Sequence, residues 1–428
     1  MALFSIIFIF FFTIFLGMPI AFSLGLTGLV TIFIVGDVSF ILAPRIMWVS
    51  IARFPLLAIS LFIFAGEVMN GAGITTRLLN FADALVGHVV GGLAHVNVIA
   101  SMFFAGITGA ASSDVACLGP LEIEMMTKAG YPRDYSTAIT VSSALLGPII
   151  PPSLPMVILG ISANMSIGAL FIAGYLPGIL IALGLMFVAY LQAKKRNYPH
   201  REKRATIKEM LKATWQAIIP LMMPVIVMGG ILGGIFTPTE AAAVACVYGV
   251  IVGLFIIKTL TFKQLPRLLL NAAEMAAMVQ IILAMSGILG WTITVMRIAE
   301  KITSFFLSVT TVPVLLLLLI NILLLIVGMI MEPGVSIVIL VPMLFPLIKT
   351  IGIHPLHFGI ILIVNLVIGL STPPVGSALF IGSAVGKVPI ERLTKALLPY
   401  YGILIVVLLL ITYIPAISLT LPRLFGFI

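Results

Sequence analysis

Residues 147–153 of the sequence read GPIIPPS, and they lie inside the longer apolar stretch SSALLGPIIPPSLPMVILG. Three prolines and a glycine therefore interrupt a segment that is otherwise suited to a membrane-spanning helix. Proline removes a backbone donor and clashes with the preceding turn, and an unpaired backbone group in hydrocarbon costs several kcal/mol. The break is either a proline kink relieved by neighbouring helices or part of a binding site built from the freed backbone groups.

The composition predicts an integral membrane protein. The chain has 428 residues, of which 61% are hydrophobic and 9% charged, and its mean hydropathy is +1.28. Soluble proteins carry roughly 25% charged residues, so the apolar runs indicate on the order of ten crossings. The apolar start has no basic region, which favours a first transmembrane helix over a cleaved signal peptide. Cys117 and Cys246 lie far apart and predict neither a disulfide nor a metal site.

The positive charge is concentrated in one short loop. Eight of the 23 Lys and Arg residues fall within residues 193–212, and the net charge is +9. The positive-inside rule predicts that such a loop is cytoplasmic, so we expect no nucleic-acid binding; a patch for lipid headgroups is the alternative. The sequence has no P-loop, HExxH or GxSxG motif, and we expect neither ATP hydrolysis nor any other enzymatic activity.

The opening motif has a partner in the second half, where residues 369–376 read GLSTPPVG. Random placement of Gly and Pro in the two segments gives about 1.4 coincidences at one offset, whereas seven occur at an offset of 222 residues. The pairs are Gly106 and Gly328, Pro120 and Pro342, Gly130 and Gly352, Gly147 and Gly369, Pro151 and Pro373, Pro152 and Pro374, and Gly160 and Gly382. The chain is predicted to be an internal duplication.

The number of spans predicts the orientation of the second copy. Each copy should have about five spans, one of them broken, and a re-entrant hairpin with a small polar centre. Since five is odd, the second copy should be inverted, and the basic loop at 258–267 then falls on the cytoplasmic side with 193–212. Both termini are predicted to be periplasmic. The predicted fold class is an all-α integral membrane protein with two inverted-topology repeats. In the first copy the spans lie near 2–17, 20–36, 54–70, 135–165 and 174–192, with the hairpin near 93–128.

Paired breaks in inverted halves are the best sequence indication of a transporter's binding site. At the first hairpin tip, Ser112, Ser113 and Asp114 offer hard oxygen atoms that suit a small cation such as sodium, although the same residue types also cap helices. At the second tip, Glu332 is a functional candidate because it is ionisable at membrane depth, or else it extends to solvent from a shallow tip.

Anion recognition is predicted at the half-helices that follow the two breaks. Helix N-termini present amide groups and a positive dipole end to an anion. Thr237, Pro238 and Glu240 instead form the pattern of a capping box, which is structural. The predicted substrate contacts are Asp114, Pro152, Ser153, Pro374 and Ser377.

Several motifs together resemble the signatures of the large membrane subunit of tripartite ATP-independent periplasmic (TRAP) transporters. These are GPIIPPS, GIFTPTEAAAVA, GMIMEPGVSIVILVP and STPPVG, and the resemblance extends from about residue 16 to about residue 400. It implies an elevator-type secondary transporter of organic acid anions that is driven by sodium and has no other cofactor. It also implies a periplasmic substrate-binding protein, a separate small membrane subunit of about four helices, and a place in the bacterial inner membrane.

The resemblance further implies two sodium sites, one in each half. The first tip, GAASSD, departs from the Ser-Gly-Ser-Ser type of run that is common in the family, and both C4-dicarboxylate and sialic acid remain candidate substrates. The implied ligands are Ser112, Ser113, Gly147 and Pro151 for one site, and Glu332, Gly334, Gly369 and Thr372 for the other.

The duplication and the resemblance together predict a division into two bodies. Residues 1–92 and 213–309 should form a scaffold, residues 93–192 and 310–428 a transport domain, and residues 193–212 the loop between them. A stand-alone sodium/dicarboxylate symporter with a similar fold is the alternative, and uptake without a binding protein would favour it. A membrane-embedded enzyme or proton-pump subunit is a further alternative, but such proteins usually contain buried chains of ionisable residues.

Overall fold

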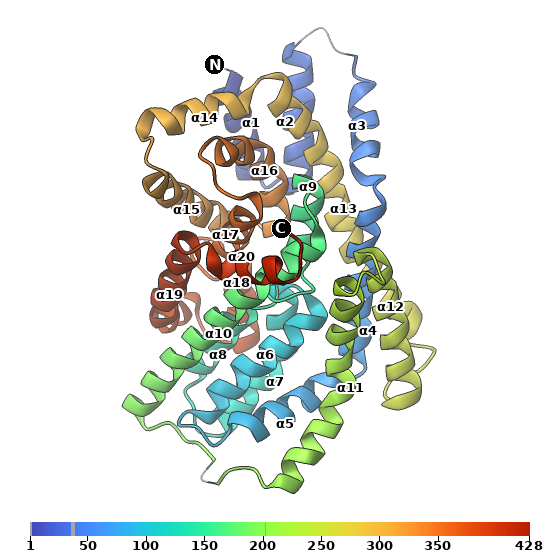
Figure 1. The fold of residues 1–428 in the computed structure, drawn as a ribbon, viewed down its shortest axis with the longest axis vertical. Helices are drawn as coiled ribbons and strands as arrows, with labels where there is room; N and C mark the ends of the chain where they lie inside the picture. Colours follow the sequence, from blue (N-terminus) through green and yellow to red (C-terminus); the bar gives the residue numbers. More distant parts are fainter. Residues whose placement is uncertain (1, 36–38, 202) are drawn as a thin grey trace.

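The computed structural model describes residues 2–35, 39–201 and 203–428, and this part of the chain is helical without any strand. Eight of its helices are long and apolar enough to cross a membrane. The predicted all-α membrane fold is therefore confirmed. Figure 1 shows an elongated bundle in which the long helices cross one another at varied angles.

The first half of the chain runs from α1 to α10. Its helices are α1 (Ala2–Phe15), α2 (Ile20–Val35), α3 (Leu42–Ile51), a 3₁₀ turn (Phe54–Leu56), α4 (Leu57–Gly71), α5 (Ile74–Val86), α6 (Gly92–Thr108), α7 (Ala111–Lys128), α8 (Arg133–Ala144), α9 (Leu154–Ala163) and α10 (Ile167–Arg196).

The second half runs from α11 to α20. Its helices are α11 (Ile207–Leu232), α12 (Pro238–Ile251) with a π-helical end (Val252–Ile256), α13 (Leu265–Val295), α14 (Ile298–Val309), α15 (Pro313–Ile330), α16 (Pro333–Thr350), α17 (Pro355–Gly369), α18 (Ser377–Gly386), α19 (Ile390–Tyr413) and α20 (Ala416–Leu424).

The offset found in the sequence is also the offset between corresponding helices. Helix α16 begins and ends 222 residues after α7, and the gap between α17 and α18 corresponds to the gap between α8 and α9. The predicted hairpins are present as α6–α7 and α15–α16. In Figure 1 the short helix that precedes each hairpin lies at a different end of the molecule, with α5 near the bottom and α14 near the top.

The helices at the centre of the bundle are α8 and α17. Every residue of α8 from Tyr135 to Ala144 is buried, as is every residue of α17 from Leu356 to Gly369. A helix that is buried on all sides belongs to the middle of a bundle. By contrast, α13 has many exposed apolar side chains, among them Leu269, Met278 and Ile281, as expected of a surface that faces lipid or another membrane protein.

The predicted capping box at the start of α12 is confirmed. The Glu240 amide donates to the Thr237 hydroxyl at 3.3 Å, and the Thr237 amide donates to the Glu240 carboxylate at 2.7 Å. These two bonds satisfy two of the amide groups that a helix N-terminus leaves unpaired. The motif TPTE therefore has a structural role in this chain.

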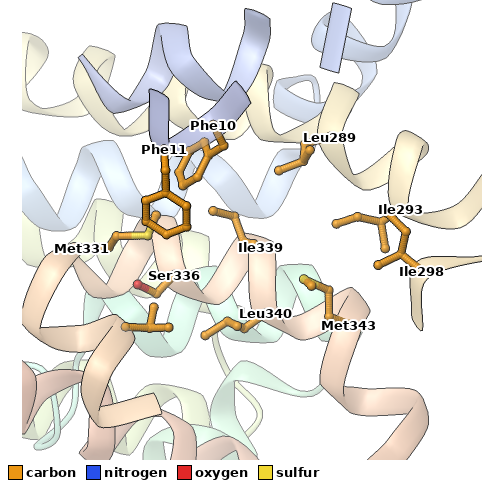
Figure 2. A pocket seen from close by; sticks show the side chains of 11 residues that line it. Phe10, Phe11, Leu289, Ile293, Ile298, Met331, Ser336, Ile339, Leu340 and Met343 are labelled. Atoms are coloured by element: carbon orange, nitrogen blue, oxygen red, sulfur yellow. The ribbon is translucent and has the colours of Figure 1, made fainter. Parts of the chain in front are cut away.

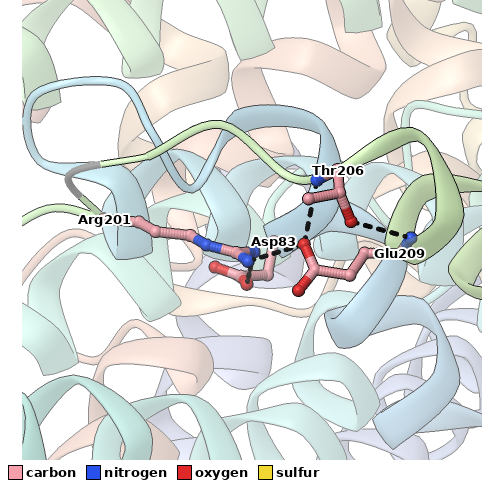
Figure 3. Close-up of polar contacts among 4 residues, drawn as sticks. All are labelled: Asp83, Arg201, Thr206 and Glu209. Carbon is pink, nitrogen blue, oxygen red and sulfur yellow. Dashed lines mark hydrogen bonds and ion pairs between the residues drawn. The ribbon is translucent and has the colours of Figure 1, made fainter.

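The basic loop that joins the two halves is attached at both of its ends. Figure 3 shows Arg201 between Asp83 of α5, at 3.6 Å, and Glu209 of α11, at 2.8 Å. Glu209 also accepts from the Thr206 amide at 2.9 Å, within a second capping box. Arg201 thereby holds the C-terminal part of the loop against α5 and α11.

The N-terminal part of the same loop is held by aromatic contacts. The Tyr131 hydroxyl, in the turn after α7, donates to the carbonyl of Pro199. Its ring lies 5.1 Å from the ring of Tyr198, which in turn lies 4.7 Å from that of Tyr135 on α8. Burial raises the pKa of Tyr131 to about 12, so the hydroxyl keeps its proton and remains a donor at neutral pH. The loop thus changes its attachment between residues 199 and 201.

Candidate substrate and ion site

The first helix break lies directly against the first hairpin tip. The Leu154 amide donates to the Gly109 carbonyl at 3.3 Å. A Cβ atom on Gly109 would lie 2.6 Å from the Pro152 carbonyl oxygen, and one on Gly147 would lie 2.5 Å from Oδ2 of Asp114. Gly109 also has a φ of +65°, which glycine adopts at little cost. Two glycines therefore permit the contact between the tip and the break.

The second break lies against the second tip in a similar way. The Gly376 amide donates to the Met329 carbonyl at 2.9 Å, and a Cβ atom on Gly369 would collide with the backbone of Gly328. Thr372 is partly buried in the break, where its hydroxyl donates to the Ile368 carbonyl at 2.9 Å. Each break contains one cis peptide bond, at Pro151–Pro152 and at Pro373–Pro374. The structure thus places each break beside the tip of its own half, as predicted.

A cavity of about 390 Å³ separates the two tips. Ser112 and Glu332 both line it, and the Ser112 hydroxyl donates to the Glu332 carboxylate at 3.5 Å. The two halves therefore meet at this point. The other lining residues are Ala110, Ala111, Ser113, Pro333, Gly334 and Val335 of the tips, Pro148, Leu154, Pro155, Ile158 and Leu370 near the breaks, Met275, Met278, Val279, Ile282 and Leu283 of α13, and Ile63 of α4.

Positive potential in this cavity comes from the backbone, because no Lys, Arg or His residue lines it among the described residues. Helices α7, α9 and α16 begin at Ala111, Leu154 and Pro333, and the first residues of all three line the cavity. Helix N-termini carry roughly half a positive charge each and present free amide groups. The sequence predicted the N-termini after the two breaks for this role; the structure adds those of the hairpin arms.

Asp114 lies behind the first tip rather than in the cavity. It is fully buried, and the Thr108 hydroxyl donates to its Oδ1, while Oδ2 has no hydrogen-bond partner and faces Gly147. A buried carboxylate without a cation is costly. Its position beside Gly147 groups Asp114 with the predicted sodium ligands, whereas the sequence grouped it with the substrate contacts.

The remaining predicted substrate contacts differ in how accessible they are. Ser153 caps α9, because its hydroxyl accepts from the Met156 amide at 3.3 Å and donates to the Pro148 carbonyl. The Ser377 hydroxyl, at the start of α18, is buried without a partner. Pro374 is exposed and Pro152 is buried. None of these four residues lines the cavity between the tips.

Sequence analysis missed a buried polar cluster that joins the first hairpin to the broken helix. The Asn97 amide donates to the Thr140 hydroxyl at 2.6 Å, and the Ser143 hydroxyl donates to Oδ1 of Asn97 at 2.6 Å. Beside them, Glu122 is fully buried, and neither of its carboxylate oxygens has a hydrogen-bond partner. Glu122 follows Asp114 by eight residues, about two helical turns, and this spacing places both on one face of α7.

The second half contains a corresponding cluster. Asn365, which is offset by 222 residues from Ser143, donates to Oδ1 of Asn321 at 2.7 Å, and the Asn321 amide donates to the Thr412 hydroxyl at 3.0 Å. Helices α15, α17 and α19 are joined by these bonds, as α6 and α8 are joined in the first half. A polar residue in each hairpin arm, at a spacing close to the repeat offset, was the available sequence signal.

Comparison with known proteins identifies relatives along almost the whole chain. The family model described as the tripartite ATP-independent periplasmic transporter, DctM component, matches residues 7–417. The sialic acid TRAP transporter large permease protein SiaM of Vibrio cholerae is 41% identical over 96% of both chains. The C4-dicarboxylate TRAP transporter large permease protein DctM of Pseudomonas aeruginosa is 40% identical over 94% of both chains. These relatives are transporter permeases, which agrees with the expectation that the chain is not an enzyme.

A fused relative and two solved structures complete the comparison. The isethionate TRAP transporter permease protein DctMQ of Oleidesulfovibrio alaskensis is 43% identical over 94% of this chain, which spans 64% of that protein. The YdaH transporter of Alcanivorax borkumensis has a TM-score of 0.58 at 17% identity, covering 89% of this chain and 87% of its own. The Neisseria gonorrhoeae efflux pump MtrF has a TM-score of 0.59 at 12% identity, covering 86% and 82%. At these identities the two structures support the fold alone.

Proposed function

We propose that this chain, which belongs to the DctM component family of tripartite ATP-independent periplasmic transporters, imports a small organic acid anion together with sodium. Membership makes it the large permease of a bacterial TRAP transporter and implies a small membrane subunit and a periplasmic binding protein as partners. The bacterial inner membrane is the location consistent with this family. The relatives named for sialic acid and C4-dicarboxylates indicate a carboxylate substrate.

The observation that carries the proposal is the cavity between the two hairpin tips. It receives three helix N-termini and no basic side chain, while the Glu332 carboxylate lines it and the Asp114 carboxylate lies just behind it. Helix dipoles alone are worth about 0.3–1 kcal/mol each at exposed sites. Adding a substrate carboxylate to a region that already holds two carboxylates therefore requires cations.

Sodium is the proposed cation at both tips. One site would use Ser112 and Ser113 with the backbone at Gly147 and Pro151, and Asp114 beside them. The other would use Glu332, Gly334, Gly369 and Thr372. Both places combine hydroxyl or carboxylate oxygens with carbonyl groups freed by a helix break, and hard cations prefer such oxygen ligands. A helix break that supplies ligands favours the binding-site interpretation of GPIIPPS over a simple proline kink.

The proposed movement is that of an elevator within two inverted repeats. Support for inversion comes from α5 and α14, which lie near different ends of the molecule (Figure 1). Support for a moving body comes from the two polar clusters, which attach each hairpin to its own broken helix. By this division the scaffold is 1–92 and 213–309, and the transport domain is 93–192 and 310–428.

The boundary between these two bodies is apolar where it can be followed in detail. Figure 2 shows a cavity of about 160 Å³ between Phe10 and Phe11 of α1, Leu289 of α13, and Ile339 and Met343 of α16. Static protein interiors are packed with few voids larger than a water molecule. A void lined by apolar side chains, between elements of different bodies, favours a boundary that slides.

The proposal is tested by uptake into proteoliposomes that contain this chain, the small subunit and the binding protein. Uptake of sialic acid or a C4-dicarboxylate should require sodium and rise more steeply than first order in it. Equal uptake with potassium, or with a proton gradient alone, would refute sodium coupling. Uptake that persists without the binding protein would favour a stand-alone symporter. Accessibility of cysteines placed at the termini would test their proposed periplasmic location.

A further inference from the structure

A second polar cavity lies apart from the cavity between the tips and shares no lining residue with it. It occupies about 280 Å³ where the start of α8, the end of α10 and the start of α19 meet, next to the basic loop. Its lining residues are Asp134 and Tyr135 of α8, Gln192 and Arg196 of α10, and Arg392, Lys395, Ala396 and Pro399 of α19.

The cavity has more positive charge than the protein neutralises. Arg196, Arg392 and Lys395 face a single carboxylate, that of Asp134, so the net charge of the lining is +2. The ion pair between Arg392 and Asp134 is long, at 3.7 Å. Arg196 donates to the Tyr198 hydroxyl at 3.0 Å, and Lys395 has no ion pair among the described residues.

Two uncharged groups in the same cavity lack hydrogen-bond partners. Tyr135 is 2% exposed, and its hydroxyl has no partner; nor does Nε2 of Gln192, a buried atom of a half-buried residue. The Tyr400 hydroxyl is near enough to affect that of Tyr135 electrostatically, yet the two make no hydrogen bond. A buried donor left without an acceptor costs about 1–3 kcal/mol. Both groups can donate to an acceptor that the protein does not itself provide.

We propose that this cavity binds the phosphoryl group of an anionic ligand, either the headgroup of a phospholipid or a free phosphomonoester. A phosphoryl group offers several strong acceptor oxygens, and the planar guanidinium groups of Arg196 and Arg392 match its geometry. A monocarboxylate would leave one positive charge unpaired. The cavity has room for about nine water molecules at about 30 Å³ each, so a substituent on the phosphoryl group can lie against Ala396 and Pro399.

The position of the cavity gives the ligand a role that differs from that of the transported anion. Helices α8, α10 and α19 all belong to the proposed transport domain, and the cavity opens beside the loop that joins this domain to the scaffold. A lipid headgroup held there fixes that end of the transport domain at the headgroup layer. A free phosphomonoester instead makes transport responsive to its concentration on that side of the membrane.

The test uses the large and small subunits together, in nanodiscs of phosphatidylcholine. Thermal unfolding is followed with added glycerol 3-phosphate or inorganic phosphate in one arm, and with phosphatidylglycerol included in the nanodisc in the other. Saturable stabilisation in the soluble arm identifies a free phosphomonoester; stabilisation by phosphatidylglycerol alone identifies a lipid. No stabilisation in either arm overturns the proposal.

Matched variants separate a built site from general attraction to a basic surface. Arg196→Gln and Lys395→Gln should weaken the apparent affinity about three- to tenfold, since each removes one donor to a charged group. Asp134→Asn should strengthen it, because it removes the only negative charge of the lining. Lys195→Gln removes the same charge from the end of α10 but outside the cavity, and should change little. Equal losses in Lys195→Gln and Arg196→Gln, or a weaker affinity in Asp134→Asn, would overturn the proposal.

Discussion

Replacing Gly109 by alanine tests whether contact between the first tip and the first break creates the sodium site. Gly109 has a φ of +65°, and its added Cβ atom would lie 2.6 Å from the Pro152 carbonyl oxygen. Ordinary contacts of a Cβ atom begin at about 3.4 Å. The tip and the break must therefore separate by roughly 0.8 Å, while metal–ligand distances tolerate only about 0.2 Å.

The structure supplies a control that isolates this displacement from the cost of the backbone conformation. Gly73 has nearly the same φ, +67°, but its added Cβ atom would meet nothing within 4 Å. An alanine in this left-handed conformation costs about 1–2 kcal/mol, so Gly73→Ala and Gly109→Ala share that term. Only Gly109→Ala also displaces the break.

The assay is the initial rate of substrate uptake as a function of sodium at constant ionic strength. Gly109→Ala should raise the half-saturating sodium concentration by at least about tenfold, the lower end of what disturbed outer-shell support costs a metal site. Gly73→Ala should leave it unchanged, with a slightly lower thermal stability. If folded Gly109→Ala protein responds to sodium as Gly73→Ala does, the tip and the break do not form the ion site together.

Three further changes address other parts of the chain. Glu122→Gln keeps the shape of a side chain that has no basic partner, and should leave folded yield and uptake within about twofold of the parent, whereas Glu122→Ala should lower the free energy of unfolding by about 2 kcal/mol; equal losses in both would show that the carboxyl group itself is needed. Burial and the nearby Arg423 lower the pKa of His354, which caps α17 as an acceptor, so stability should be full above pH 6.5 and decline as pH falls through the lowered pKa; His354→Asn should reduce that decline in thermal unfolding, and an unchanged profile would exclude His354 as its source. A disulfide between cysteines at Ile293 and Met343, which line the cavity of Figure 2 from α13 and α16, should stop uptake reversibly; unaffected uptake after complete cross-linking would refute the sliding boundary.

Sequence reasoning was most successful where a residue type has a single strong physical consequence. Prolines and glycines at the offset of 222 located both breaks, and the order Thr237, Pro238, Glu240 located a helix start. Proline and glycine restrict the backbone locally, so their effect can be read without knowledge of the tertiary contacts.

The sequence was less informative about groups whose role depends on what packs against them. Asp114 was assigned to the substrate, but the fold turns it toward Gly147. Ser153 was assigned likewise, although its hydroxyl is engaged in capping α9. Glu122 was missed because Pro120 made its segment look interrupted, whereas α7 continues through that proline. Short-range patterns do not say which neighbour a side chain meets, and that neighbour decides its role.

The absence of basic side chains from the lining of the cavity between the tips has a consequence for coupling. A lysine or arginine there would attract the anion whether or not an ion is bound, and would let the transport domain move with substrate alone. Glu332 and Asp114 instead make the empty site unfavourable for an anion, and a bound cation reverses this because charges interact strongly in a low-dielectric interior. By linkage, the substrate must then increase the affinity for sodium by the same factor as sodium increases the affinity for substrate. Introducing a positive charge by Ser112→Lys, next to Glu332, should therefore reduce the sodium dependence of substrate binding. Binding measured by calorimetry in detergent, with and without sodium, would contradict this argument if the variant binds substrate only when sodium is present.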